Sequence, residues 1–101
     1  MPRPAEGGGD PAARRARIAR IVERVGAIPE GFVRTYGDVD PAAPRLVGHV
    51  LATTEVDLPW HRVVRADGTV AKGRRQLSLL RAEGVPIRNG RVELALARLP
   101  G

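Results

Sequence analysis

The amino-acid sequence predicts a mainly α-helical domain that carries small β-hairpins. Three observations lead to this fold class. Apolar residues recur at helical spacing in three segments, glycine-containing turns divide short runs that favour strands, and 101 residues are the size of one small domain. Only Phe32, Tyr36 and Trp60 are aromatic, so the core must be aliphatic.

Residues 1–10 (MPRPAEGGGD) are rich in proline and glycine. We expect a flexible tail there, followed by one folded domain over residues 11–101. The first helix is predicted to begin near Ala12 and to end at Gly26, with Pro29 just beyond it. Its apolar stripe consists of Ile18, Ile21, Val22 and Val25.

The middle of the chain predicts a short extended segment and then a second helix. Residues 29–35 (PEGFVRT) are typical of a turn that leads into extended backbone. The second helix starts near Pro44, because proline suits the first position of a helix. Its apolar stripe consists of Leu46, Val47, Val50 and Leu51. Residues 53–57 (TTEVD) predict a loop.

Two hairpins are predicted in the second half of the chain. Residues 61–71 (HRVVRADGTVA) favour a hairpin around Ala66-Asp67-Gly68, because Asp-Gly supplies the positive backbone dihedral that such a turn needs. Residues 85–94 (VPIRNGRVEL) favour another, with Asn89-Gly90 as its turn.

A short helix is predicted between these hairpins, over residues 75–84, with Gly84 at its end. Leu77 and Leu80 face inward in this interpretation, and Leu79 is a third candidate. Helices with two small β accessories resemble a winged-helix DNA-binding domain.

Composition excludes several function classes. The chain has no cysteine, which excludes disulfides, thiolate metal sites and cysteine nucleophiles. Two histidines without clustered carboxylates disfavour a metal site, and we expect no cofactor. No apolar run matches a membrane span or a signal peptide, so we expect a cytoplasmic protein without a membrane partner. The formal charge of +6 favours a polyanion, most commonly nucleic acid.

Four motifs occur in one order along the chain: IPEGFVRTYGDV, PRLVGHVL, LPWHRVVRADGTV and QLSLLRAEGV. Together they resemble the DNA-binding domain of the O6-alkylguanine-DNA alkyltransferases, over Ile18 to Val85. That family carries Pro-Cys-His-Arg at its active site, where this chain has Pro59-Trp60-His61-Arg62. The chain therefore resembles more closely the alkyltransferase-like proteins, in which the cysteine is replaced, often by tryptophan.

The resemblance implies a site that has lost its nucleophile. In the alkyltransferases a relay runs from cysteine to histidine, through a water, to a glutamate, and His61 and Glu83 match those positions. An indole N–H does not ionise near neutral pH, so Trp60 cannot accept an alkyl group as a thiolate does. Two structural interpretations stay open. Trp60 could anchor an aromatic-poor core, and the His61–Glu83 pair could only hold loop and helix together.

The resemblance also implies base flipping from the minor groove. Arg45 matches the arginine that fills the space left by the flipped base, and Tyr36, next to Thr35, matches the tyrosine that rotates a neighbouring phosphate. Gly48 would let the helix approach a narrow groove, although packing against the first helix would also explain it. Arg45 as a solvated residue and Tyr36 as a packed turn residue are the structural alternatives.

The remaining predicted residues border a pocket for the lesion. The basic run over residues 71–76 (AKGRRQ) contributes the side chains of Lys72, Arg74 and Arg75, which would contact phosphates or the flipped base. Such a run is also typical of a solvated surface. The predicted pocket residues are Pro59, Trp60, His61, Val63, Val64 and Arg74, and the predicted DNA contacts are Thr35, Tyr36, Arg45, Gly48, Lys72 and Arg75.

The chain departs from the family pattern in three places. The segment between Tyr36 and Arg45 is shorter, which predicts that a helix there is reduced to a turn and that the DNA-facing surface is narrower or is completed by a partner. The family's asparagine before the active-site motif is absent, and Thr53 or Thr54 only partly replaces it. His49 occupies a position where relatives have a small or neutral side chain.

The resemblance implies a monomeric, nucleoid-associated, non-catalytic sensor of O6-alkylguanine in double-stranded DNA that hands lesions to nucleotide excision repair proteins. Two alternatives stay open: an enzyme in which His61 accepts an alkyl group or attacks another electrophile, and a winged-helix regulator that reads sequence. No surface for the handover can be assigned from the sequence.

Overall fold

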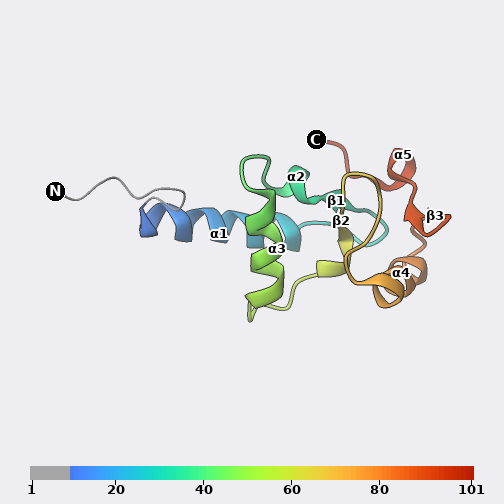
Figure 1. Cartoon of the computed structure of the whole chain (residues 1–101), viewed down its shortest axis with the longest axis horizontal. Coiled ribbons are helices and arrows are strands. Elements are labelled where there is room, and N and C mark those ends of the chain that lie inside the picture. Colours follow the sequence, from blue (N-terminus) through green and yellow to red (C-terminus); the bar gives the residue numbers. More distant parts are fainter. Residues whose placement is uncertain (1–9) are drawn as a thin grey trace.

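The computed structural model describes residues 10–101, so the tail predicted over residues 1–10 lies almost entirely outside them. Figure 1 shows a long first helix, α1, that projects to one side of the remaining elements. α1 (Pro11–Gly26) begins where predicted, because the Asp10 carboxylate accepts a hydrogen bond of 3.1 Å from the amide of Ala12. Within residues 10–101, no helix has the length and apolar character needed to cross a bilayer.

α1 and α3 pack against each other as the apolar stripes predicted. Ile21 and Val25 of α1 are buried against Val47 and Val50 of α3 (Pro44–Thr53). The chain crosses between these helices in α2 (Tyr36–Val39), which is a single turn, and this confirms the predicted reduction to a turn.

α2 is short but firmly capped. The hydroxyl of Thr35 accepts a hydrogen bond from the amide of Asp38, and the Asp38 carboxylate accepts one from the amide of Thr35, both at 3.0 Å. Arg98 also donates to this carboxylate, and its hydrogen bonds lower the pKa of Asp38 to about 2. The cap therefore fixes the backbone position of Tyr36, the first residue of α2, relative to the strand that precedes it.

The hairpin predicted over residues 61–71 is wrong. The turn exists, since the amide of Gly68 donates to the carbonyl of Arg65 at 2.8 Å. However, β2 (Val63–Val64) pairs in parallel with β1 (Arg34–Thr35), 29 residues earlier in the chain. The arm after the turn leads into the next helix instead of returning along β2. A local turn signal cannot reveal such a distant partner.

Gly68 is required by close packing. Its φ is +85°, and an added Cβ would lie 2.5 Å from the carbonyl oxygen of Val92. The Asp-Gly pair is therefore a genuine turn that serves packing against the second hairpin.

The second hairpin is confirmed. β3 (Ile87–Arg88) and β4 (Arg91–Val92) are antiparallel, and the turn residues Asn89 and Gly90 have φ of 53° and 75°. These positive values are those of the two-residue turns that suit hairpins. The short helix α5 (Leu94–Ala97), which the sequence did not predict, follows it.

α4 (Gly73–Ala82) begins two residues earlier than predicted, and Gly84 follows its end with φ of +83°. Leu80 is buried and Leu77 is half-buried, as predicted. Leu79 faces outward, with 38% of its surface exposed.

Aliphatic side chains form two cores, as the lack of aromatic residues predicted. One core joins α1, α2 and α3, and the other joins α4, the second hairpin and α5. The neighbours Val63 and Val64 belong to different cores, because successive side chains of a strand point to opposite sides. β2 therefore connects the two halves of the molecule.

Candidate nucleic-acid interface

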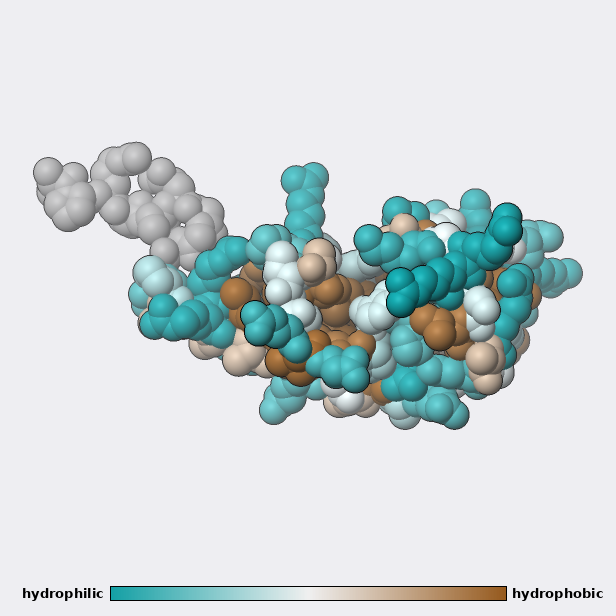
Figure 2. All heavy atoms as spheres, turned by 90° about the horizontal axis from the view of Figure 1, so that it is seen from below, coloured by the Kyte–Doolittle hydropathy of each residue, from teal (hydrophilic) through white to brown (hydrophobic). Residues whose placement is uncertain are grey.

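A cavity of about 630 Å³ lies between α3 and α4, a size suited to a small molecule or a single base. Its lining residues are Tyr36, Gly48, Leu51, Ala52, Trp60, Ala71, Lys72, Arg75 and Gln76. Figure 2 shows brown apolar atoms near the centre of the face seen from below, with hydrophilic side chains around them. The cavity brings together the predicted pocket residue Trp60 and four of the predicted DNA contacts, Tyr36, Gly48, Lys72 and Arg75.

Trp60 forms one wall of this cavity. It begins the 3₁₀ turn η1 (Trp60–Arg62), which follows Pro59 and leads directly into β2. Its ring packs edge-to-face on the ring of His61, with 5.9 Å between centroids and 82° between planes. Trp60 is half-buried and faces a hollow, so it is not an anchor of either core.

Arg75 lies over one face of this indole. Its guanidinium carbon is 5.4 Å from the centroid of the Trp60 ring, which is the range of a cation–π contact. Because Trp60 and Arg75 come from η1 and α4, they form adjacent walls that offer a planar apolar surface and a positive charge. A flat heteroaromatic base matches that combination.

Gln76 is a site residue that sequence reasoning missed. Its side-chain amide donates to the backbone carbonyls of His61 and Val63 at 3.0 and 2.9 Å, and its carbonyl accepts from the amide of Lys72 at 3.1 Å. Gln76 is buried and thereby ties η1 to the start of α4. The sequence did contain a signal for this role. Gln76 lies four residues before the buried Leu80 and therefore on the same face of the helix, where a buried polar side chain needs a hydrogen-bond partner.

His61 and Glu83 meet as predicted, but directly instead of through a water. His61 Nε2 lies 2.7 Å from Glu83 Oε2. Arg62 donates to the same carboxylate from Nε at 2.9 Å and from Nη2 at 2.8 Å, and the amide of Gly31 donates at 3.3 Å. Arg62 comes from the same short turn as His61, so it holds Glu83 close to that histidine.

The electrostatics of this cluster favour an ionised carboxylate. Hydrogen bonds from Arg62 first, and then from His61 and Gly31, lower the pKa of Glu83 to about 2 against the opposing effect of burial. The same contact raises the pKa of Arg62. Arg62 also donates to the carbonyl of Ile28 at 2.9 Å, so the cluster fastens η1 to α4 and to the loop after α1.

Several predicted residues lie elsewhere. Val63 and Val64 are fully buried in the two cores, so they do not line the cavity as predicted; their place in β2 directs both side chains inward. Pro59, His61 and Arg74 are also outside its lining. The sequence did not predict the lining residues Leu51, Ala52 and Ala71, which are small or apolar and carry no chemical signature.

The predicted DNA-contact residues differ in their freedom to contact a ligand. Arg45 is exposed at the second position of α3, and the hydroxyl of Thr35 is engaged in the cap of α2. Tyr36 is half-buried, and burial raises the pKa of its phenol. Tyr36 thus presents an uncharged phenol at the cavity.

Gly48 is not explained by packing against α1. An added Cβ would lie 3.8 Å from Cε1 of Tyr36, an ordinary contact, and no atom of α1 is within 4 Å of it. The alternative interpretation of this glycine as a helix-packing residue is therefore wrong.

The family profile described as "6-O-methylguanine DNA methyltransferase, DNA binding domain" matches residues 16–85. The chain belongs to this family. This agrees with the sequence resemblance to the alkyltransferase DNA-binding domain, and it places the Pro59–Arg62 motif and the cavity walls inside the matched region.

Two similar members of the family have informative names. The DNA base-flipping protein of Escherichia coli K12 is 44% identical over 87 residues, covering 74% of this chain and 67% of that protein. Alkyltransferase-like protein 1 of Schizosaccharomyces pombe is 35% identical over 81 residues, covering 67% of this chain and 75% of that protein.

Solved structures of the alkyltransferase-like protein of S. pombe confirm the fold class. Its complex with damaged DNA containing O6-carboxymethylguanine matches with a TM-score of 0.75 and 28% identity, covering 86% of this chain and 97% of that one. A second complex with DNA matches with a TM-score of 0.70 and 30% identity, covering 85% and 97%.

Proposed function

We propose that this protein recognises O6-alkylguanine in double-stranded DNA, binds from the minor groove and holds the flipped base without removing the alkyl group. One observation carries the proposal: the cavity between α3 and α4 is walled by Trp60, at the motif position where the alkyltransferases have cysteine. The names of the relatives and the damaged-DNA complex that resembles this fold support it.

The cavity supplies what a flipped guanine needs. Rotating a nucleotide out of the stack costs a few kcal/mol, which contacts to the exposed base must offset. Trp60 and Arg75 offer stacking and cation–π contacts, and the volume of about 630 Å³ leaves room for an alkyl substituent. Arg45, exposed on α3, would fill the gap in the duplex, and Tyr36 would contact the neighbouring backbone.

Non-catalytic binding follows from the chemistry of the site. The chain contains no cysteine, and the indole that replaces it does not ionise near neutral pH. Arg62 and His61 share the carboxylate of Glu83, and no thiol is present for this pair to activate, so His61 and Glu83 act as a structural clamp. The remaining relay therefore positions Trp60 and activates nothing.

The biological role of such a complex would be to signal. We propose that a monomer, associated with the nucleoid in the cytoplasm, presents the lesion to nucleotide excision repair proteins. This part of the proposal rests on the resemblance to alkyltransferase-like proteins.

A competition assay tests the function. Duplexes that differ only in one O6-methylguanine compete for the protein, and we expect at least a tenfold preference for the alkylated strand. Equal affinity combined with dependence on sequence would favour a regulator. A methyl adduct on His61, detected by mass spectrometry after incubation, would instead establish an enzyme.

Arg45 provides a second test of base flipping. Arg45→Ala should reduce affinity for the alkylated duplex by more than tenfold, because the vacated position in the stack stays unfilled. Arg81→Ala is the matched control, since Arg81 is exposed on α4 away from the cavity lining. Equal behaviour of the two variants would contradict insertion of Arg45.

A further inference from the structure

α1 is strongly basic. Its sequence PAARRARIARIVERVG contains five arginines and one acidic residue, Glu23. Arg17 pairs with Asp40 at 3.1 Å, and Arg24 donates to the carbonyl of Val39 at 2.7 Å, so these two hold α1 to the segment before α3. Arg14 precedes these two arginines in α1. Among residues 10–101, no carboxylate lies within salt-bridge distance of it.

Arg14 lies on the side of α1 that faces α3. It precedes Ile18 by four residues and Ile21 by seven, so it continues the buried stripe towards the N-terminus of the helix. Since this part of α1 projects past α3, Arg14 is exposed and not buried.

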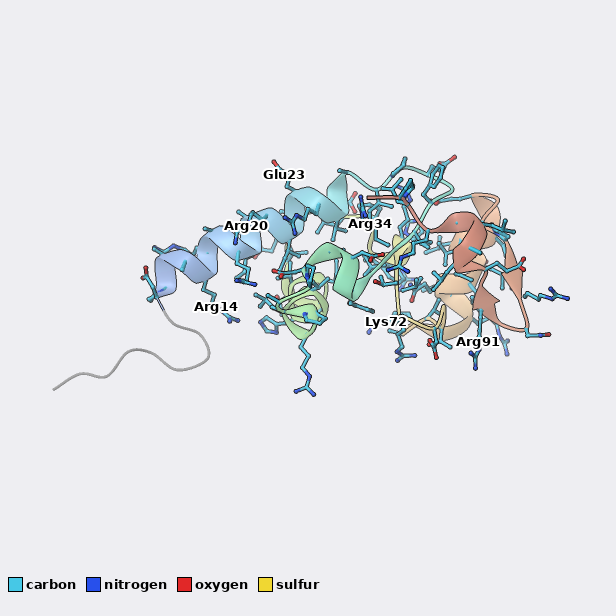
Figure 3. The ribbon with its side chains drawn as sticks, turned by 90° about the horizontal axis from the view of Figure 1, so that it is seen from above. Arg14, Arg20, Glu23, Arg34, Lys72 and Arg91 are labelled. Atoms are coloured by element: carbon cyan, nitrogen blue, oxygen red, sulfur yellow. The ribbon has the colours of Figure 1, made fainter. Side chains whose placement is uncertain are left out.

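Basic side chains from several elements lie on the side of the molecule where α3 lies. In Figure 3, Arg14, Lys72 and Arg91 are on that side, whereas Glu23 is on the opposite side, where Arg20 and Arg34 are also labelled. Lys72 also lines the cavity, so Arg14 and the cavity wall belong to the same basic side. A long polyanion that crosses α3, parallel to the long axis of the molecule in Figure 1, would pass both.

We propose that Arg14 contacts a phosphate of the same duplex that α3 engages, and that α1 thereby extends the DNA-binding surface beyond the cavity. The inference rests on the proposed function only in placing α3 on the duplex. Seven residues of helix between Arg14 and Ile21 correspond to about 10 Å, which is roughly three base pairs of DNA. The contact is to backbone, so it is independent of the lesion.

The test compares two arginines of one helix. Arg20 follows Arg14 by six residues, which places it about 120° around the helix, away from the buried stripe. Arg14→Ala and Arg20→Ala remove the same charge from exposed positions and introduce the residue that favours helix most. Binding is measured by fluorescence anisotropy over a range of salt concentrations, on alkylated and on unmodified duplexes.

We expect Arg14→Ala to weaken binding to both duplexes by roughly five- to tenfold near 0.1 M salt, and to reduce the slope of log K against log salt by about one. Arg20→Ala should leave the slope unchanged. Shortening one flank of the duplex by about three base pairs should reduce the affinity of the unmutated protein and abolish the effect of Arg14→Ala.

Two results would overturn the inference: equal slopes for both variants, which would mean that only net charge matters, or an unchanged slope for Arg14→Ala. Neither depends on lesion preference. A protein without preference for O6-methylguanine would contradict the proposed function and still leave the contribution of Arg14 to be decided by the slope.

Discussion

At the scale of single residues, the carboxylate of Glu83 is the most constrained group of the site. It accepts hydrogen bonds from His61, Arg62 and the amide of Gly31, and its side chain is only 12% exposed. The motif identified His61 and Glu83 from the sequence. Two other roles depend on three-dimensional packing, which no local pattern shows: Arg62 is the main hydrogen-bond partner of Glu83, and Gln76 connects η1 to α4.

Glu83→Gln should lower the free energy of unfolding by about 3 kcal/mol at pH 7, because Arg62 then lies half-buried without its counter-charge. The folded-state pKa of Glu83, about 2, is below the ordinary 4.5, so its contribution is present above pH 4.5 and is lost as the pH falls towards 2. Urea unfolding of both proteins between pH 3 and 7 measures the difference.

The difference between the two proteins should therefore shrink steadily below pH 4.5. A difference that stays constant over the whole range would show that the shape of the side chain matters and its charge does not.

At the scale of elements, the helix α3 contains a residue, Gly48, that lowers its own helical stability. Glycine inside a helix costs about 1 kcal/mol relative to alanine, and nothing in the described structure prevents a methyl group at Gly48. The helices α1, α3 and α4 and the Asn89-Gly90 hairpin were predictable because their signals are local. The pairing of β1 with β2 was not, because its strands are two residues long and far apart in sequence.

Gly48→Ala should raise the free energy of unfolding by up to about 1 kcal/mol and weaken duplex binding by at least tenfold, because the methyl group points towards the cavity and the approaching DNA. Gly26→Ala is the matched control. It lies at the end of α1, and its Cβ would also meet a side-chain atom at 3.8 Å. Urea unfolding and fluorescence anisotropy supply the two measurements.

The control should gain stability and keep its affinity. If Gly48→Ala binds DNA as well as the unmutated protein does, close approach of α3 to the duplex is contradicted.

At the scale of the whole molecule, two small aliphatic cores meet at β2. Each core has few side chains, and domains of this size bury little surface to spare. The sequence predicted that the core would be aliphatic, and it predicted the faces of α1 and α3. It could not predict the division into two cores, because this division follows from the parallel pair β1–β2.

Val63→Ala and Val64→Ala should each lower the free energy of unfolding by about 2 kcal/mol, although they remove methyl groups from different cores. Both variants should still unfold in one transition, because β2 couples the two halves. The fluorescence of Trp60 and far-ultraviolet circular dichroism, followed in the same urea titration, measure this. Separate midpoints for the two signals would contradict the coupling.

The ladder of β1 and β2 has a kinetic consequence. Tyr36 follows β1 directly and Trp60 lies three residues before β2, so backbone pairing sets the separation of the two aromatic walls. A binding site held in this way is pre-organised, because the conformational entropy of its walls is lost when the chain folds and not when DNA binds. The slow event on association then belongs to the duplex, whose nucleotide must leave the stack, and damaged steps that open more readily should be captured faster.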